Sequence, residues 1–143
     1  MIELASTVII TMLSTLLFGY WFRYTCLLIL SAKTTRDYAC DVATANQLSF
    51  LRIQSELRQA MPSDLERLHA SLDRDYDVLK SLLKQTLGLE ERMLQLNYRL
   101  MGVWCSAARK FSPSAARKAL DEMTLVLAHF ANSMGEQACA AAA

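Results

Sequence analysis

The stretch Leu4–Phe22 reads LASTVIITMLSTLLFGYWF and holds nineteen residues without a charged side chain. A helix of nineteen residues is about 28 Å long, which is close to the hydrocarbon thickness of a bilayer. From Ala32 onward, in contrast, charged residues recur every few positions. The sequence therefore predicts a transmembrane anchor with its membrane-edge segment over residues 1–31, followed by a domain on one side of the membrane.

Aromatic and basic side chains gather where this span ends. Such side chains favour the boundary between lipid and water, because their apolar bodies stay in lipid while their polar tips reach water or phosphate. The predicted membrane-interface residues are Tyr20, Trp21, Arg23 and Tyr24. A second apolar run reaches Leu30, so the membrane helix either ends near Phe22 or, as we slightly prefer, continues in a tilted form to Leu30.

The charges on the two sides of the span predict its orientation. No Lys or Arg precedes it, whereas Arg23, Lys33 and Arg36 follow. Positive loops stay in the cytoplasm, so the N-terminus is expected outside and the C-terminal domain in the cytoplasm. The first residues, Met-Ile-Glu, lack the positive charge of a signal peptide, and we expect the anchor to stay uncleaved.

Small residues recur every four positions within the span, at Thr7, Thr11, Thr15 and Gly19. This spacing places them on one face of a helix, where small side chains let two membrane helices approach closely. The alternative is that the threonine hydroxyls bond back to their own backbone. We predict the first, a face for helix packing in the membrane.

The remaining chain predicts an all-α domain. Only four Gly and two Pro occur, which is few for a β-rich fold. Apolar residues recur at steps of three and four, and breaks at Pro62, Gly88 and Pro113 give helices over residues 32–61, 63–87, 89–110 and 113–138. Short links favour an antiparallel bundle. Without the break at Gly88 the domain becomes a three-helix coiled coil, and residues 139–143 are expected to fray.

The helical spacing also selects the residues that should form the core of this bundle. The predicted core residues are Phe50, Ile53, Leu57, Leu65, Leu68, Leu72, Leu79, Leu82, Met93, Leu96, Leu100, Leu120, Met123, Leu127 and Phe130. In the third helix the row runs from Leu89 to Ala107, through Met93, Leu96, Leu100 and Val103. Two polar residues, Asn46 and Asp75, interrupt the rows and either fix the helix register or lie at the rim. The rim is expected for Asp75, because Tyr76 beside it can take the core position.

Two local patterns concern helix starts and a binding surface. Ser63 and Glu66 form a capping-box pattern that should begin the second helix. Basic pairs flank the turn at Ser112-Pro113, and a turn with four positive charges can meet an acidic partner. The residues of this predicted partner-binding turn are Arg109, Lys110, Arg117 and Lys118.

No pattern in the sequence indicates catalysis or a cofactor. The Glu66-x-x-His69 pair occurs once, and His129 lacks a Glu three residues before it, so neither a di-iron site nor a haem is expected. There is no phosphate-binding glycine loop, and a net charge of +1 disfavours nucleic acid. The four cysteines lack metal-binding spacing and are expected to stay reduced.

The function expected from these patterns is that of a membrane-anchored helical interaction or scaffold module. Its partners would be the lipid bilayer and either further copies of the chain or a larger membrane complex. No enzyme activity, cofactor, metal or small-molecule substrate is predicted. The alternative is an accessory subunit of a membrane enzyme or electron-transfer complex, which absorption spectra and metal content would distinguish.

Overall fold

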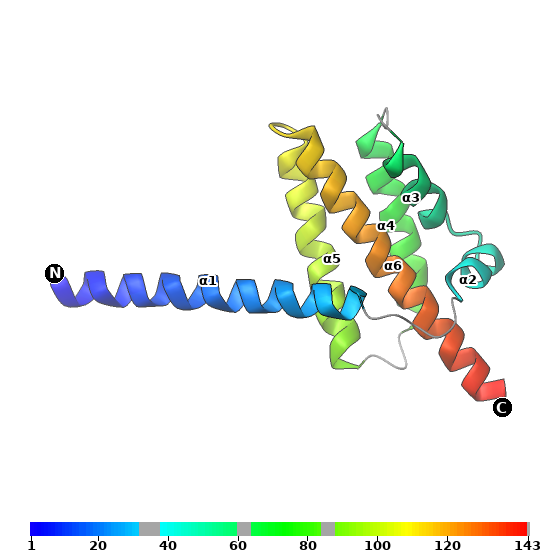
Figure 1. Cartoon of the computed structure of the whole chain (residues 1–143), viewed down its shortest axis with the longest axis horizontal. Coiled ribbons are helices and arrows are strands. Elements are labelled where there is room, and N and C mark those ends of the chain that lie inside the picture. The colour runs from blue at the N-terminus through cyan, green and yellow to red at the C-terminus, as the bar shows by residue number, and fades with distance from the viewer. Residues whose placement is uncertain (32–37, 60–63, 84–87, 143) are drawn as a thin grey trace. The chain divides into compact units, whose positions relative to one another are not determined.

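The structure is a computed structural model that describes residues 1–31, 38–59, 64–83 and 88–142 (Figure 1). These residues are helical and contain no strand. Their helices are α1 (Ile2–Ser31), α2 (Ala39–Ala45), α3 (Phe50–Arg58), α4 (Leu65–Leu82), α5 (Leu89–Ala108) and α6 (Pro113–Ala142). The chain divides into two compact units, residues 1–32 and 33–143, and each is described by itself.

The first unit is the single helix α1, which has 30 residues. Helix α1 continues through the second apolar run, because that run contains no helix-breaking residue. At the end of the helix, Ser31 Oγ donates to the carbonyl of Leu28 at 2.9 Å. A helix of this length extends about 45 Å, more than a bilayer core requires without tilt. By length and composition α1 is long and apolar enough to cross a membrane.

The second unit is organised around α6, which contacts α2, α3, α4 and α5. Helices α5 and α6 run side by side in opposite directions and are joined by the short turn at residues 109–112 (Figure 1). Pro113 opens α6, where its missing N–H removes no helical bond. The inner face of α6 repeats at steps of three and four and is fully or almost fully buried: Ala116, Ala119, Leu120, Met123, Val126, Leu127, Phe130 and Ala131.

The helix expected over residues 32–61 is two helices in the described part of this range, α2 and α3. Asn46 ends α2, and its side-chain amide donates to the carbonyl of Val42 at 3.0 Å. Gln47 then adopts a left-handed backbone with φ of 54°, and the Leu48 amide donates back to Ala43 at 2.8 Å. Asn46 therefore serves to end a helix and does not set the register of a continuous row.

The expectation that Asp75 lies at the rim is wrong. Its exposed fraction is 1%, and Tyr76 beside it is buried as well. Asp75 Oδ2 accepts hydrogen bonds from the amide of Ser49 at 2.7 Å and from Ser49 Oγ at 3.1 Å. Ser49 is the residue that precedes α3, so a carboxylate from α4 caps the start of α3.

The starts of α4 and α5 differ in detail from the sequence pattern. Asp64 caps α4, because its Oδ1 accepts from the amide of Arg67 at 3.1 Å, while Ser63 lies outside the described residues. Gly88 directly precedes α5 in an extended conformation, so α4 and α5 are separate helices. Separation at Gly88 matches the predicted break and rules out one continuous rod.

Most of the predicted core residues are buried, two are half-buried and three are exposed. The buried ones are Phe50, Ile53, Leu57, Leu68, Leu72, Leu79, Leu120, Met123, Leu127 and Phe130. Leu65 and Met93 are half-buried. Leu82, Leu96 and Leu100 are exposed, contrary to the expectation. At the end of α4 the adjacent Leu83 is buried in place of Leu82, and α5 turns a different face inward.

The C-terminal residues also differ from the expectation, since α6 continues to Ala142. Alanine has the highest intrinsic helix propensity, so an alanine-rich end extends a preceding helix readily. Gly135 lies inside α6 and is buried. A Cβ at this position would overlap the side chain of Tyr38, so glycine here permits close packing of Tyr38 against α6. Asn132 Oδ1 accepts from the Tyr38 amide at 2.8 Å and holds the same contact.

Candidate functional site

The outer face of α5 is the most extensive apolar surface in the described part of residues 38–142. It carries the row that the sequence assigned to the core, which we call the outer row: Leu89, Met93, Leu96, Leu100, Val103 and Ala107. Met93 is half-buried and the other members are exposed, with Leu89 at 76% and Val103 at 71%. The expectation that Leu96 and Leu100 fill the core is therefore wrong.

The inner face of α5 lies on the other side of the helix. It packs against α6 and α4 through Leu94, Asn97, Tyr98, Cys105 and Ala108, all of which are buried. At about 100° per residue the outer row lies roughly 140° around the helix from this buried face. Helix α5 is thus apolar on two sides, and the spacing of apolar residues alone does not say which side the core takes.

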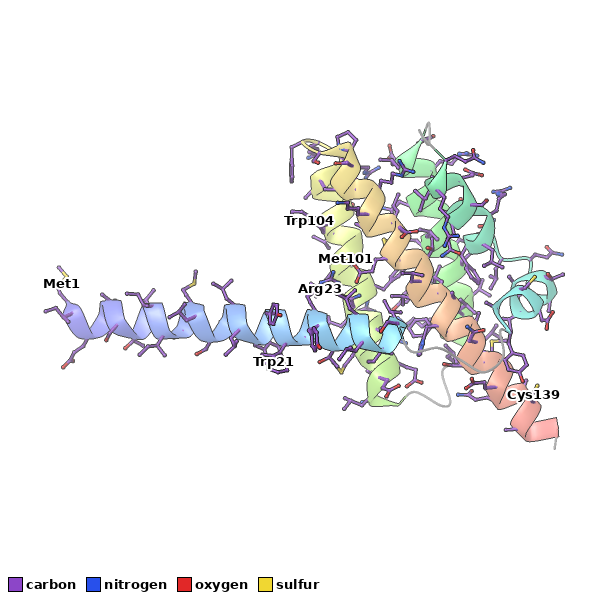
Figure 2. The ribbon with its side chains drawn as sticks, viewed as in Figure 1. Met1, Trp21, Arg23, Met101, Trp104 and Cys139 are labelled. Carbon is purple, nitrogen blue, oxygen red and sulfur yellow. The ribbon has the colours of Figure 1, made fainter. Side chains whose placement is uncertain are left out.

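Two aromatic rings enlarge the exposed surface at the C-terminal end of α5. Trp104 projects from α5 (Figure 2), and Phe111 follows in the turn. Their ring centroids lie 6.1 Å apart in an edge-to-face arrangement, and both side chains are exposed, Phe111 by 67%. Exposed aromatic rings beside an apolar row are typical of surfaces that bind another protein.

The predicted basic turn is only partly free to meet a partner. Arg117 is engaged inside the unit, where Nε donates to the carbonyl of Leu57 at 2.6 Å and Nη2 donates to that of Gln59 at 2.7 Å. These bonds satisfy carbonyls at the end of α3. Arg109 lies 3.8 Å from a carboxylate oxygen of Glu66. Lys110 and Lys118 remain exposed, so the turn is less basic than its sequence implies.

A cluster of polar side chains joins α4 to α5. Tyr98 donates from its hydroxyl to Asp73 Oδ1 at 2.9 Å, and His69 Nε2 lies 3.6 Å from Asp73 Oδ2. The rings of Tyr76 and Tyr98 stack with centroids 4.1 Å apart and planes 6° apart. Burial, reinforced by the negative charge of Asp73, raises the pKa of Tyr98, and burial also raises the pKa of Tyr76.

This polar cluster borders a groove of about 510 Å³. His69 and Asp73 lie at one wall and Arg99 at the other, so the groove carries both signs of charge. The hydrogen bond from Tyr98 to Asp73 and the stacked rings join the two helices, so the cluster acts as a clamp between α4 and α5. Sequence reasoning missed this clamp, and the acidic run Asp73-Arg-Asp-Tyr-Asp77 was the signal that could have indicated it.

Within the residues that the structure describes, the predicted metal-ligand pair and the cysteines can also be located. Glu66 and His69 do not converge, because Glu66 faces Arg109 and His69 faces Asp73. No group of three or more His, Cys, Asp and Glu side chains is arranged to hold a metal among the described residues. None of the four cysteines, all of which lie in described residues, forms a disulfide; Cys105 is buried, which raises the pKa of its thiol, and Cys40 and Cys139 are exposed.

The small-residue row of α1 shows hydroxyls bonded within the helix. Thr7 donates to the carbonyl of Glu3, Thr11 to that of Thr7, and Thr15 to that of Thr11, at 2.8 to 2.9 Å. A Cβ added at Gly19 would meet no atom within 4 Å. These bonds are the alternative considered for this row, in which the hydroxyls bond to the backbone of their own helix.

The predicted membrane-interface residues form an aromatic group on α1. Tyr20 and Tyr24 stack at 6.4 Å, and Trp21 meets Tyr24 edge-on at 6.2 Å between ring centroids. Trp21 and Arg23 project from the later part of α1 (Figure 2). No family model matches the chain, and neither does any curated protein or solved structure.

Proposed function

We propose that α1 spans a membrane and that the second unit works beside it as an antiparallel helical bundle, an interaction module held at the bilayer. The observation that carries this proposal is the exposed apolar surface of α1. Its large apolar side chains include Leu4, Ile9, Leu13, Leu17 and Phe18, each more than half exposed. Burying one such side chain contributes about 1.5–3 kcal/mol, so leaving the whole set in water would cost more than a small domain gains on folding.

The orientation follows from the charges around α1. The basic residues Arg23, Lys33 and Arg36 follow the apolar stretch and none precedes it. We infer that the N-terminus lies outside and the second unit in the cytoplasm. The aromatic group at Tyr20, Trp21 and Tyr24 then lies toward the inner boundary of the membrane, and the tilted helix continues through the second apolar run.

Confinement to a bilayer supports a role in association. Anchored copies share a plane and one orientation, which raises their effective concentration for one another. The small-residue face of α1 and the outer face of α5 are the two surfaces that support contact with a neighbour. We therefore propose that the chain self-associates or docks onto a larger membrane complex, and that it performs no chemistry of its own.

Fractionation of cells that express the full chain tests the anchor. We expect the wild-type chain to stay in the membrane pellet after extraction with alkaline carbonate. Replacing Leu13 and Leu17 with arginine places two charges in the apolar stretch, each at a cost of about 2.5–3.5 kcal/mol, and should release the chain. Gln54→Arg is the control for added positive charge. The helices of the second unit already carry arginine at the exposed positions Arg52 and Arg67, so one more arginine there should not release the chain. A wild-type chain that disperses in water without detergent would contradict the proposal.

Chemical labelling of an exposed cysteine tests the orientation. Cys139 is exposed near the end of α6 and lies in the unit that we assign to the cytoplasm. A membrane-impermeant maleimide should label Cys139 only after the membrane is opened.

Cross-linking in intact membranes tests whether the chain has a neighbour. A species that stays monomeric and brings no partner through mild detergent would remove the interaction role while leaving the anchor in place.

A further inference from the structure

We propose that the outer row of α5 binds the outer row of a second copy, with the two α5 helices antiparallel. This inference rests on the proposed self-association and names the surface that carries it. The row turns away from the core of its own unit, and five of its six members are exposed. An apolar row of this kind in water is stabilised when another apolar surface covers it.

The spacing of the row fits a coiled-coil contact between like helices. From Leu89 to Ala107 the steps are four, three, four, three and four, the repeat of a two-helix seam. This series reads the same in both directions. An antiparallel copy therefore places Leu89 opposite Ala107, Met93 opposite Val103, and Leu96 opposite Leu100, so every position of the row finds a partner in one register.

The charges at the two ends of α5 select the antiparallel arrangement. Glu90 and Glu91 lie in its first turn, and Arg109 and Lys110 follow its last residue. Antiparallel packing brings the acidic end of one copy beside the basic end of the other, and it also opposes the two helix dipoles favourably. Parallel packing would instead place Glu90 beside Glu90 and Lys110 beside Lys110.

The exposed area suits a dimer. With side-chain areas of about 150–250 Å² for aromatic residues and somewhat less for leucine and valine, the exposed members together with Trp104 and Phe111 present roughly 600 Å² of apolar surface. A stable protein interface buries about 800 Å² on each partner, of which somewhat more than half is apolar. The α5 face therefore supplies the apolar core of a standard interface without any contribution from elsewhere.

Two substitutions of exposed leucines test the interface in the full chain. In membranes of vesicles that contain the purified chain, we expect Leu96→Gln/Leu100→Gln to weaken dimerisation at least tenfold. Leu82 is a matched control, because it is the same residue type with 47% exposure on α4, and Leu82→Gln should change dimerisation less than twofold. Unchanged helix content and thermal unfolding of each variant show that folding is intact.

The position of a single cysteine tests the direction of packing. The background replaces Cys26, Cys40 and Cys139 with serine and keeps the buried Cys105. In the antiparallel register Leu96 of one copy faces Leu100 of the other, so a mixture of Leu96→Cys and Leu100→Cys chains should form an oxidised heterodimer. Leu89 and its mate are about 27 Å apart along the axis, so Leu89→Cys should form no oxidised dimer. Cross-linking of Leu89→Cys would contradict the antiparallel arrangement.

Several outcomes separate this interface from the proposed function. A dimer that survives Leu96→Gln/Leu100→Gln but is lost with Gly19→Leu would assign association to α1 and overturn the α5 interface alone. A wild-type chain that is monomeric in these vesicles would overturn the α5 interface and the proposed self-association, while the anchor and docking onto a larger membrane complex would remain. Lipid is the other candidate cover for α5, and Trp21→Phe leaves Trp104 as the remaining tryptophan to report on it. Quenching of Trp104 by brominated lipid would show that the bilayer covers this face and would overturn the proposal.

Discussion

Helices α5 and α6 lie side by side and both carry an apolar row at helical spacing, yet only one row is buried. The row of α6 contains Leu120, Met123, Leu127 and Phe130, each with 0% exposure. The row of α5 contains Leu96 and Leu100, exposed by 51% and 46%. The difference shows that a regular apolar row identifies a contact surface without saying whether its partner belongs to the same unit.

The two helices differ because of where they lie in the second unit. Helix α6 touches α2, α3, α4 and α5, and these contacts together bury the one broad face that carries its apolar row. Helix α5 packs mainly against α6, and this contact occupies one side only. The opposite side of α5 keeps its apolar residues although no helix of the described unit covers them. The core of a single chain therefore does not account for the apolar residues on the outer face of α5.

The largest expected effect is the loss of a core ring from α6. Phe130→Ala should lower the free energy of unfolding by about 3–5 kcal/mol, because it removes a fully buried side chain and leaves a cavity. Phe111→Ala is the matched control, since the same change is made at a ring exposed by 67%. In the monomer it should cost less than about 0.5 kcal/mol. Denaturant unfolding of the full chain in detergent, followed by circular dichroism, measures both.

Similar losses for Phe130→Ala and Phe111→Ala would break the comparison between the two helices. At a dilution that keeps the chain monomeric, they would mean that the ring at Phe111 is covered by part of the same molecule. A small loss for both would mean that the core around α6 is loosely packed. Either result would remove the basis for treating the outer face of α5 as a surface for a second chain.

The next effect compares the two faces of α5 directly. Leu94 is fully buried and Leu96 is about half exposed, although they lie two residues apart. Leu94→Ala should cost about 2–4 kcal/mol, and Leu96→Ala less than about 1 kcal/mol in a monomer. If α5 pairs with a second copy, the cost of Leu96→Ala should grow with protein concentration, because dimerisation stabilises the folded state. A cost independent of concentration would speak against the α5 interface.

The sequence predicted the buried face of α6 better than that of α5, and the reason is physical. In α6 the apolar positions form one row, so spacing alone identified Leu120, Met123, Leu127 and Phe130. In α5 the true inner face includes Asn97, Tyr98 and Cys105, whose polar atoms make it look less apolar than the outer row. Asn97 is accommodated because its side-chain amide donates to Glu122 on α6 at 3.1 Å. Hydrogen bonds between distant residues make a polar face suitable for the core, and local spacing does not reveal them.

The same reasoning explains the other differences. The length of α1 and the separation of α4 from α5 at Gly88 follow from composition and from a helix-breaking residue, both of which are local. The role of Asp75 depends on Ser49, 26 residues away along the chain. The role of Arg117 depends on the end of α3, which is farther still. Arg117 therefore looked like part of a basic partner site, although its charge serves carbonyls within the unit.

The smallest expected effect concerns Tyr98, on the inner face of α5. Removing its hydroxyl with Tyr98→Phe breaks the hydrogen bond to Asp73 and should cost about 1 kcal/mol near neutral pH, since Asp73 is half exposed and regains water. Tyr76→Phe is the control, because it changes the stacked partner ring and leaves that hydrogen bond in place.

The pH dependence gives the second measure of Tyr98. Burial raises the pKa of Tyr98 in the folded chain above the ordinary tyrosine value of 10.0, so the folded state holds the proton more tightly than the unfolded state. This contribution to stability is complete below pH 10 and is lost as the pH rises beyond it. Unfolding followed across this range should therefore show a shallower alkaline loss for Tyr98→Phe than for wild type. The remaining slope belongs in part to Tyr76, whose pKa is also raised. An unchanged alkaline slope would place Tyr98 in contact with water, and the inner face of α5 would then not be the buried one.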